Sequence, residues 1–119
     1  MIGVLARLMK LKQKSKETLM SDAVHVFAHV VAAPGKEDEL RAVLKELVKE
    51  THKEPGVKMY VLHEEPKKPG SFHVFEIYEN QAAADSHMKS PHLAAAFAKA
   101  GALLGAAPSI IETKAIAGH

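Results

Sequence analysis

The order of strand-like and helix-like patterns constrains the fold of this chain more than any other feature. An apolar β-branched run is followed by an amphipathic helical stripe, two strand-like runs, two helical pieces and a last strand-like run. These patterns occupy residues 24–32, 36–53, 57–63, 72–79, 81–89, 91–104 and 108–116. The order predicts an α+β domain of the ferredoxin-like, split βαβ type, with a four-stranded antiparallel sheet.

The clearest single pattern is the helix predicted at residues 36–53. Its apolar residues recur at spacings of three and four, which places them on one face. They are Leu40, Val43, Leu44, Leu47 and Val48. Acidic residues crowd the first turn, where negative charge interacts favourably with the helix dipole. Pro55 and Gly56 follow the helix and end it.

The strand predicted at residues 24–32 is apolar on both faces, since neither alternating set of its side chains is strongly polar. Helices can cover one face of the sheet, and we expect a second copy of the chain to cover the other. The sequence therefore predicts a homodimer. His25 and His29 share one face of this strand. With no cysteine in the chain and no close carboxylate on the strand, we expect them at the interface rather than at a metal.

Composition limits the chemistry and the partners. A length of 119 residues suits one domain. The chain has no cysteine, which excludes disulfides, thiol nucleophiles and thiolate metal sites. Five basic residues stand in the first 20 against Glu17 alone, so the rest of the chain is mildly acidic. This distribution argues against nucleic acid as a partner.

The basic segment divides the chain into an N-terminal extension, residues 1–22, and a domain at residues 23–117. Two interpretations of the extension stay open. It is a poorly ordered or partner-docked extension that precedes the domain, or residues 1–20 form a transit-like amphipathic helix or one that contacts acidic membrane lipid. No apolar run reaches the roughly 20 residues that span a bilayer, and we expect a cytoplasmic protein.

Titratable side chains gather at residues 72–97, where a predicted strand passes into two helical pieces. They are Glu76, Tyr78, Glu79, His87 and His92. The two histidines flank Ser90 and Pro91, a usual way to end one helix and begin the next. Since the surrounding segment is apolar, this junction is a candidate to line a pocket.

Three short motifs follow one another in this part of the chain. A helix end carries Thr51, Glu54, Pro55 and Gly56 with Tyr60 beyond it, a strand carries Phe72, Glu76, Tyr78 and Glu79, and a helix junction carries His87, Ser90 and His92. In their order and spacing these motifs resemble the antibiotic biosynthesis monooxygenase superfamily, most closely its quinol monooxygenase branch. The resemblance extends over residues 24–117.

The resemblance implies a dimeric α+β barrel, in which two ferredoxin-like subunits pack sheet against sheet. It further implies a monooxygenase without cofactor or metal that oxidises a small quinol or phenolic aromatic with dioxygen. The chain departs from the branch in having Tyr78 where tryptophan is usual and His52 where arginine is common. The haem-degrading members carry that tryptophan and a helix histidine, which falls near Phe97 here, so haem degradation is disfavoured.

Cofactor-free oxygenation needs a base that removes the substrate's phenolic proton, and His87 is the candidate because imidazole titrates near neutral pH. Glu76, if buried, could accept the other N–H of His87 and orient the ring. The resemblance suggests Tyr60, Tyr78 and His92 as substrate-binding residues. Structural alternatives remain for each: His87 could cap its helix, Glu76 could be a buried anchor or a rim charge, and Tyr60 could belong to the core.

Two other functions stay open at this point. The chain could be a small-molecule-binding or stress-response protein without chemistry of its own. It could also be an isomerase of a phosphorylated small molecule, which would need a cationic cluster at the pocket mouth. Lys58 and Lys89 are the obvious candidates for that cluster. An open cavity lined by aromatic residues and histidine would favour an enzyme, and a plugged pocket would not.

Overall fold

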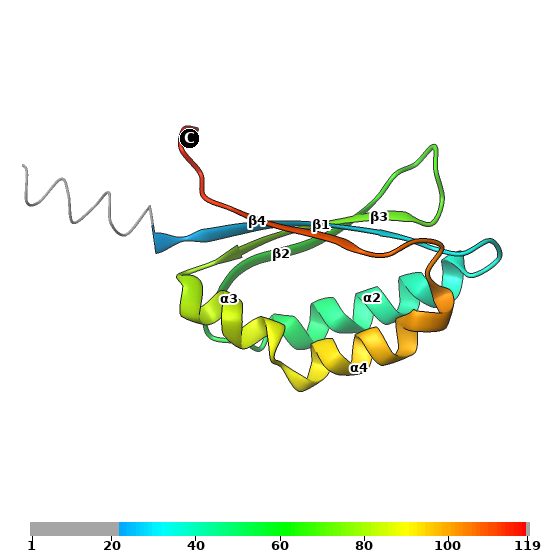
Figure 1. Cartoon of the computed structure of the whole chain (residues 1–119), viewed down its shortest axis with the longest axis horizontal. Coiled ribbons are helices and arrows are strands. Elements are labelled where there is room, and N and C mark those ends of the chain that lie inside the picture. Colours follow the sequence, from blue (N-terminus) through cyan, green and yellow to red (C-terminus); the bar gives the residue numbers. More distant parts are fainter. Residues whose placement is uncertain (1–21, 119) are drawn as a thin grey trace, which may run out of the picture.

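The computed structural model describes residues 22–118, which form one four-stranded antiparallel sheet with three α-helices on one of its faces (Figure 1). The strands are β1 (Val24–Val31), β2 (Val57–Glu64), β3 (Ser71–Tyr78) and β4 (Ser109–Thr113). The helices are α2 (Glu37–Thr51), α3 (Gln81–Met88) and α4 (Pro91–Ala100), followed by the 3-10 turn η1 (Gly101–Leu103). This confirms the predicted α+β class and element order. The predicted basic extension lies outside the described residues, apart from Asp22.

Two elements end three or more residues before their predicted ends. The last strand ends at Thr113 rather than at residue 116, because its pairing partner on β1 is His25, one residue from the start of that strand. The helical piece predicted at residues 91–104 ends at Ala100 and tightens into η1, after which Leu104 is extended and bridges to Ala32. No helix within residues 22–118 is both long and apolar enough to span a bilayer.

The strand order β2-β3-β1-β4 places the first strand in the middle of the sheet. All three pairings are antiparallel. Successive side chains of each strand point to opposite faces of the sheet. One face packs against the helices, and we call the other, uncovered face the outer face. The sheet is completed when β4, the last strand in the sequence, pairs with β1, the first.

The core lies between the sheet and the helices. The predicted apolar stripe of α2 is largely buried there through Leu40, Leu44 and Leu47, with Val43 and Val48 partly buried. Phe72 of β3 is fully buried among the α2 residues. Burial of such side chains stabilises the fold by about 1.5–3 kcal/mol each.

The outer face carries apolar side chains that no described element covers. The exposed ones are Phe27, Met59, Val61 and Ile111. Beside them, His63, His73 and His29 stand in register on three neighbouring strands, and the rings of His29 and His73 stack with centroids 4.3 Å apart. His25 and His29 thus lie on the face where the interface was predicted.

Candidate functional site

A cavity of about 60 Å³ lies between the helix-facing side of the sheet and the helices. Its lining side chains are apolar except for Tyr60, Glu76 and His87. A space of this size holds a few water molecules. Met88 and Phe97 line it and are also 49% and 42% exposed, so these two side chains separate the cavity from solvent.

Glu76 is the carboxyl group of this cavity. It lies on β3 opposite Tyr60 of β2 and is 5% exposed. The hydroxyl of Tyr78 donates to its Oε1 at 2.5 Å. Burial raises the pKa of Glu76 to about 7, the charge of Glu54 adds to the rise, and the Tyr78 hydrogen bond opposes it. The carboxyl group is therefore close to half-protonated at neutral pH, which suits proton transfer.

The two tyrosines occupy different positions. Tyr60 lines the main cavity, whereas Tyr78 lies behind Glu76 and lines a smaller adjoining space of about 10 Å³. Burial raises the pKa of both phenols well above its ordinary range, and the charge of Glu76 contributes to both rises. Both hydroxyls stay protonated at any physiological pH and can only act as neutral hydrogen-bonding groups.

His87 lies near the end of α3 with its side chain 3% exposed. Its ring is flanked by those of Tyr60 and Tyr78, at centroid distances of 5.4 and 5.3 Å. Its Nδ1 lies 2.7 Å from Oε2 of Glu54. The predicted orientation of His87 by Glu76 is therefore wrong: Glu54 holds the ring, while Glu76 is bound to Tyr78.

The junction between α3 and α4 sets the spacing of the two histidines. The Ser90 hydroxyl donates to the carbonyl oxygen of His87 at 2.7 Å and accepts from the backbone N–H of Leu93 at 3.3 Å. It thereby caps α4 as it ends α3. His92, in the first turn of α4, places its Nε2 2.6 Å from the same Oε2 of Glu54. His92 does not line the cavity but an open surface cleft that Glu54 also borders.

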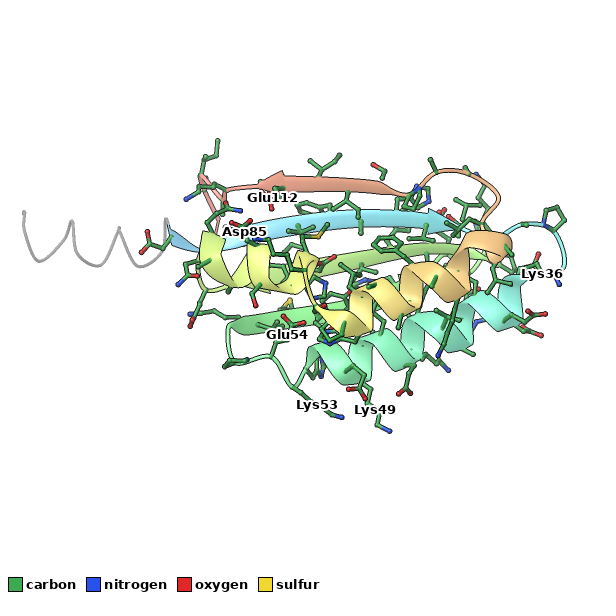
Figure 2. All side chains as sticks on the ribbon, turned by 60° about the horizontal axis from the view of Figure 1, so that its bottom comes forward. Lys36, Lys49, Lys53, Glu54, Asp85 and Glu112 are labelled. Carbon is green, nitrogen blue, oxygen red and sulfur yellow. The ribbon has the colours of Figure 1, made fainter. Side chains whose placement is uncertain are left out.

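The structure thus brings Tyr60, Glu76 and His87 together at one cavity, with Tyr78 behind Glu76 and His92 outside. Glu54 was part of the recognised motif but was not predicted as a site residue. It stands in the turn between α2 and β2, and its side chain reaches the α3–α4 junction (Figure 2).

A glycine allows this close approach. A Cβ on Gly56 would lie 2.5 Å from the Cβ of Ala83, so only glycine lets α3 pack over the turn that carries Glu54. The signal in the sequence was the Glu-Pro-Gly turn itself, because it combines a carboxylate with the glycine that lets a helix approach.

Two groups of side chains within residues 22–118 hold metal-ligating atoms within 4.8 Å of one another. One is Glu54 with His87 and His92. The other is His29, His73 and Glu65 on the outer face, where Glu65 Oε2 lies 2.9 Å from Nε2 of His73. The hairpin loop therefore brings a carboxylate to the histidine row, although β1 itself offers none nearby.

Comparison with known proteins gives a consistent result. Residues 23–99 match the model of the family described as antibiotic biosynthesis monooxygenase. The structure of PA3566 from Pseudomonas aeruginosa is similar with a TM-score of 0.76 and 28% identity, covering 82% of this chain and 98% of that one. The structure of Rv0793 from Mycobacterium tuberculosis is similar with a TM-score of 0.75 and 29% identity, covering 81% of this chain and 97% of that one.

Sequence comparison finds the mycobacterial protein as well. Rv0793, named only provisionally as a monooxygenase, is 34% identical over 85 residues, which cover 71% of this chain and 83% of that protein. The uncharacterized protein sll1783 of Synechocystis is 30% identical over 71 residues, or 60% of this chain. That match spans 48% of sll1783, so the similarity covers about half of the cyanobacterial protein.

Proposed function

The chain belongs to the antibiotic biosynthesis monooxygenase family, and on that premise we propose that it oxidises a small quinol or phenolic aromatic with dioxygen, without a cofactor. The observation that carries the proposal is the apolar cavity that His87 and Glu76 line together with Tyr60. An aromatic ring suits the apolar lining, and its hydroxyl group suits the imidazole.

In the proposed reaction, the imidazole of His87 removes the hydroxyl proton of the substrate, and the electron pair of that O–H bond stays on the substrate oxygen. The resulting anion passes one electron to dioxygen, which gives a substrate radical and superoxide. These combine at carbon into a peroxide, which loses water. For an anthrone, the methylene carbon gives up two hydrogens and gains one oxygen atom, while the second oxygen leaves as water. The balance needs no external reductant.

The other cavity residues have supporting roles in this proposal. Glu76 is near half-protonated at pH 7, so it can donate a proton to the peroxide before water leaves, and the proton held by His87 then replaces it. The neutral hydroxyl of Tyr60 can hydrogen-bond the substrate anion. The apolar lining excludes water from the radical pair, which protects it from side reactions.

Oxygen uptake with a panel of quinols and anthrones tests the proposal, with ¹⁸O₂ as the oxidant. We expect saturable uptake with at least one substrate, and one labelled oxygen atom in the product for each oxygen molecule consumed. Uptake no faster than spontaneous oxidation across the panel would contradict the proposal. Tight binding without uptake would indicate instead a binding protein of the same fold.

We also propose that a second copy of the chain covers the outer face, as the exposed apolar side chains there favour. Phe27 is central to this face, 52% exposed and stacked on Phe75 at 5.0 Å. Phe27→Asp should weaken association at least about a hundredfold, because a buried, unpaired carboxylate costs several kcal/mol. Analytical ultracentrifugation at micromolar protein would show a monomer for the variant and a dimer for the parent.

The matched control for Phe27→Asp is Ala42→Asp, which places the same carboxylate on an exposed position of α2. We expect Ala42→Asp to sediment as the parent does. If Phe27→Asp also sediments as the parent, another surface holds the dimer. If the parent itself is a monomer at all concentrations, the proposed assembly is wrong.

A further inference from the structure

We infer that Glu54 is the positioning residue of this site: its carboxylate determines which nitrogen of His87 is basic and balances the charge that His87 gains with a proton. This role rests on the proposed function of His87 as the base. Glu54 touches neither the cavity nor a substrate within it, so it acts through the imidazole.

The first step is the tautomer of His87. An ionised carboxylate can only accept hydrogen bonds. A separation of 2.7 Å between Nδ1 of His87 and Oε2 of Glu54 therefore requires the hydrogen on Nδ1. The lone pair of the neutral ring is then on Nε2, which has no hydrogen-bond partner among residues 22–118. Since the ring lines the cavity and is almost fully buried, Nε2 is the nitrogen available to a substrate there.

The second step is what holds Glu54. His92 donates from Nε2 to the same oxygen at 2.6 Å, so one carboxylate oxygen accepts from two imidazoles. The side chain of Glu54 is 15% exposed, and that of His92 is 21% exposed. His92 therefore closes the solvent side of the carboxylate and restrains its rotation. This assigns His92 a place behind Glu54 rather than the predicted contact with substrate.

The third step is the charge. The negative charge of Glu54 is felt across the site, where it contributes to the raised pKa of Glu76 and of Tyr60. In a poorly solvated site, a carboxylate in direct contact with an imidazole stabilises the imidazolium that forms when Nε2 takes a proton. The proton moves from the substrate oxygen to Nε2, and the Nδ1–H···Oε2 bond then joins an imidazolium to a carboxylate.

The same three residues resemble a metal site with two histidines and one carboxylate, but their spacing favours hydrogen bonds. Ligands at about 2.0–2.1 Å from a tetrahedral zinc ion stand about 3.3 Å from one another. The two nitrogens instead lie 2.7 and 2.6 Å from the carboxylate oxygen, the distances of charge-assisted hydrogen bonds.

The test reads the tautomer directly and needs no substrate. Long-range ¹H–¹⁵N correlation spectra of the purified protein should show neutral His87 with its hydrogen on Nδ1. In Glu54→Ala this preference should be lost, and in Glu54→Gln it should persist because the amide oxygen still accepts. Glu46→Ala, an exposed position on α2, serves as the control and should leave the His87 signals unchanged. A wild-type His87 with its hydrogen on Nε2 would overturn the assignment, whether or not the protein oxidises quinols.

Kinetics with any substrate found active separate positioning from charge. Glu54→Gln should lower kcat by roughly tenfold to a thousandfold with little change in KM, because geometry is kept while the charge is lost. His92→Ala should lower kcat by a smaller factor than Glu54→Gln does, about tenfold to a hundredfold at most. Unchanged kcat in Glu54→Gln would contradict the charge-balancing role.

Titration of the wild type with ZnCl₂ gives a last check. Stoichiometric binding that shifts the signals of His87 and His92, and that disappears in Glu54→Ala, would show a metal site instead.

Discussion

Replacing His87 with alanine should lower the rate of substrate oxidation by roughly 10²–10⁴-fold, the usual contribution of a positioned general base. The imidazole is one of three titratable side chains that line the cavity, with Glu76 and Tyr60, and the rest of the lining is apolar. Without it, the hydroxyl proton must leave to water or to Glu76. Oxygen uptake under saturating substrate measures the loss directly, and a more alkaline buffer should recover part of the rate, because the substrate then ionises in solution.

Ser86→Ala is the matched control for His87→Ala. Ser86 precedes His87 on the same helix but is exposed, so its loss leaves the cavity intact. Both variants should keep the far-ultraviolet circular dichroism of the parent. Equal uptake rates for the parent and His87→Ala, at every pH tested, would remove His87 from the mechanism.

The second large effect is expected in the free energy of unfolding when Glu76 is replaced. Glu76→Gln should stabilise the folded state relative to the parent by about 3 kcal/mol at pH 8, an advantage absent below about pH 4.5. The folded protein keeps the Glu76 proton up to about pH 7, whereas the unfolded chain releases it near 4.5, the ordinary pKa of a glutamate side chain. Between these values the folded state binds more protons, so the parent loses stability as pH rises. Glutamine stays neutral and can still accept from Tyr78.

Urea unfolding of the parent and of Glu76→Gln at pH 4.5, 6 and 8 measures this difference. Glu112→Gln is the control: Glu112, labelled on β4 in Figure 2, lies on the same face of the sheet as Glu76 but is exposed, and it accepts a hydrogen bond from Gln81. The difference in unfolding free energy between Glu112→Gln and the parent should grow much less between pH 6 and 8 than the difference for Glu76→Gln. A Glu76→Gln advantage that is the same at every pH would mean that burial does not hold the proton on Glu76.

The sequence predicted the fold well, because the patterns that define it are local. The α2 stripe and the two-sided β1 each specify their element, and the order of elements specifies the sheet. The ends of elements depend on partners instead. Thr113 ends β4 where its partner His25 lies one residue from the start of β1, a fact that residues 108–116 do not contain.

The site was predicted in part. Glu76 and His87 were both identified, but their relation was not, because each forms its hydrogen bond with a different partner in the folded structure. Tyr78 is two residues from Glu76 on the same strand face, and its hydroxyl donates a hydrogen bond to one oxygen of Glu76. His87 then bonds to Glu54, 33 residues earlier in the chain. Such a choice depends on how α3 packs over the Gly56 turn, which no local pattern reveals.

The central position of β1 has a consequence for synthesis. Thr113 of β4 donates to the carbonyl oxygen of His25, 88 residues earlier in the chain. As the chain leaves the ribosome, one edge of β1 therefore stays without its native partner until nearly all of the domain has emerged. An unpaired strand edge is a template for pairing with other chains, and contacts this distant form slowly. A chain truncated before β4 would keep that edge open and should aggregate, so β4, although only five residues long, protects the completed domain as well as completing the sheet.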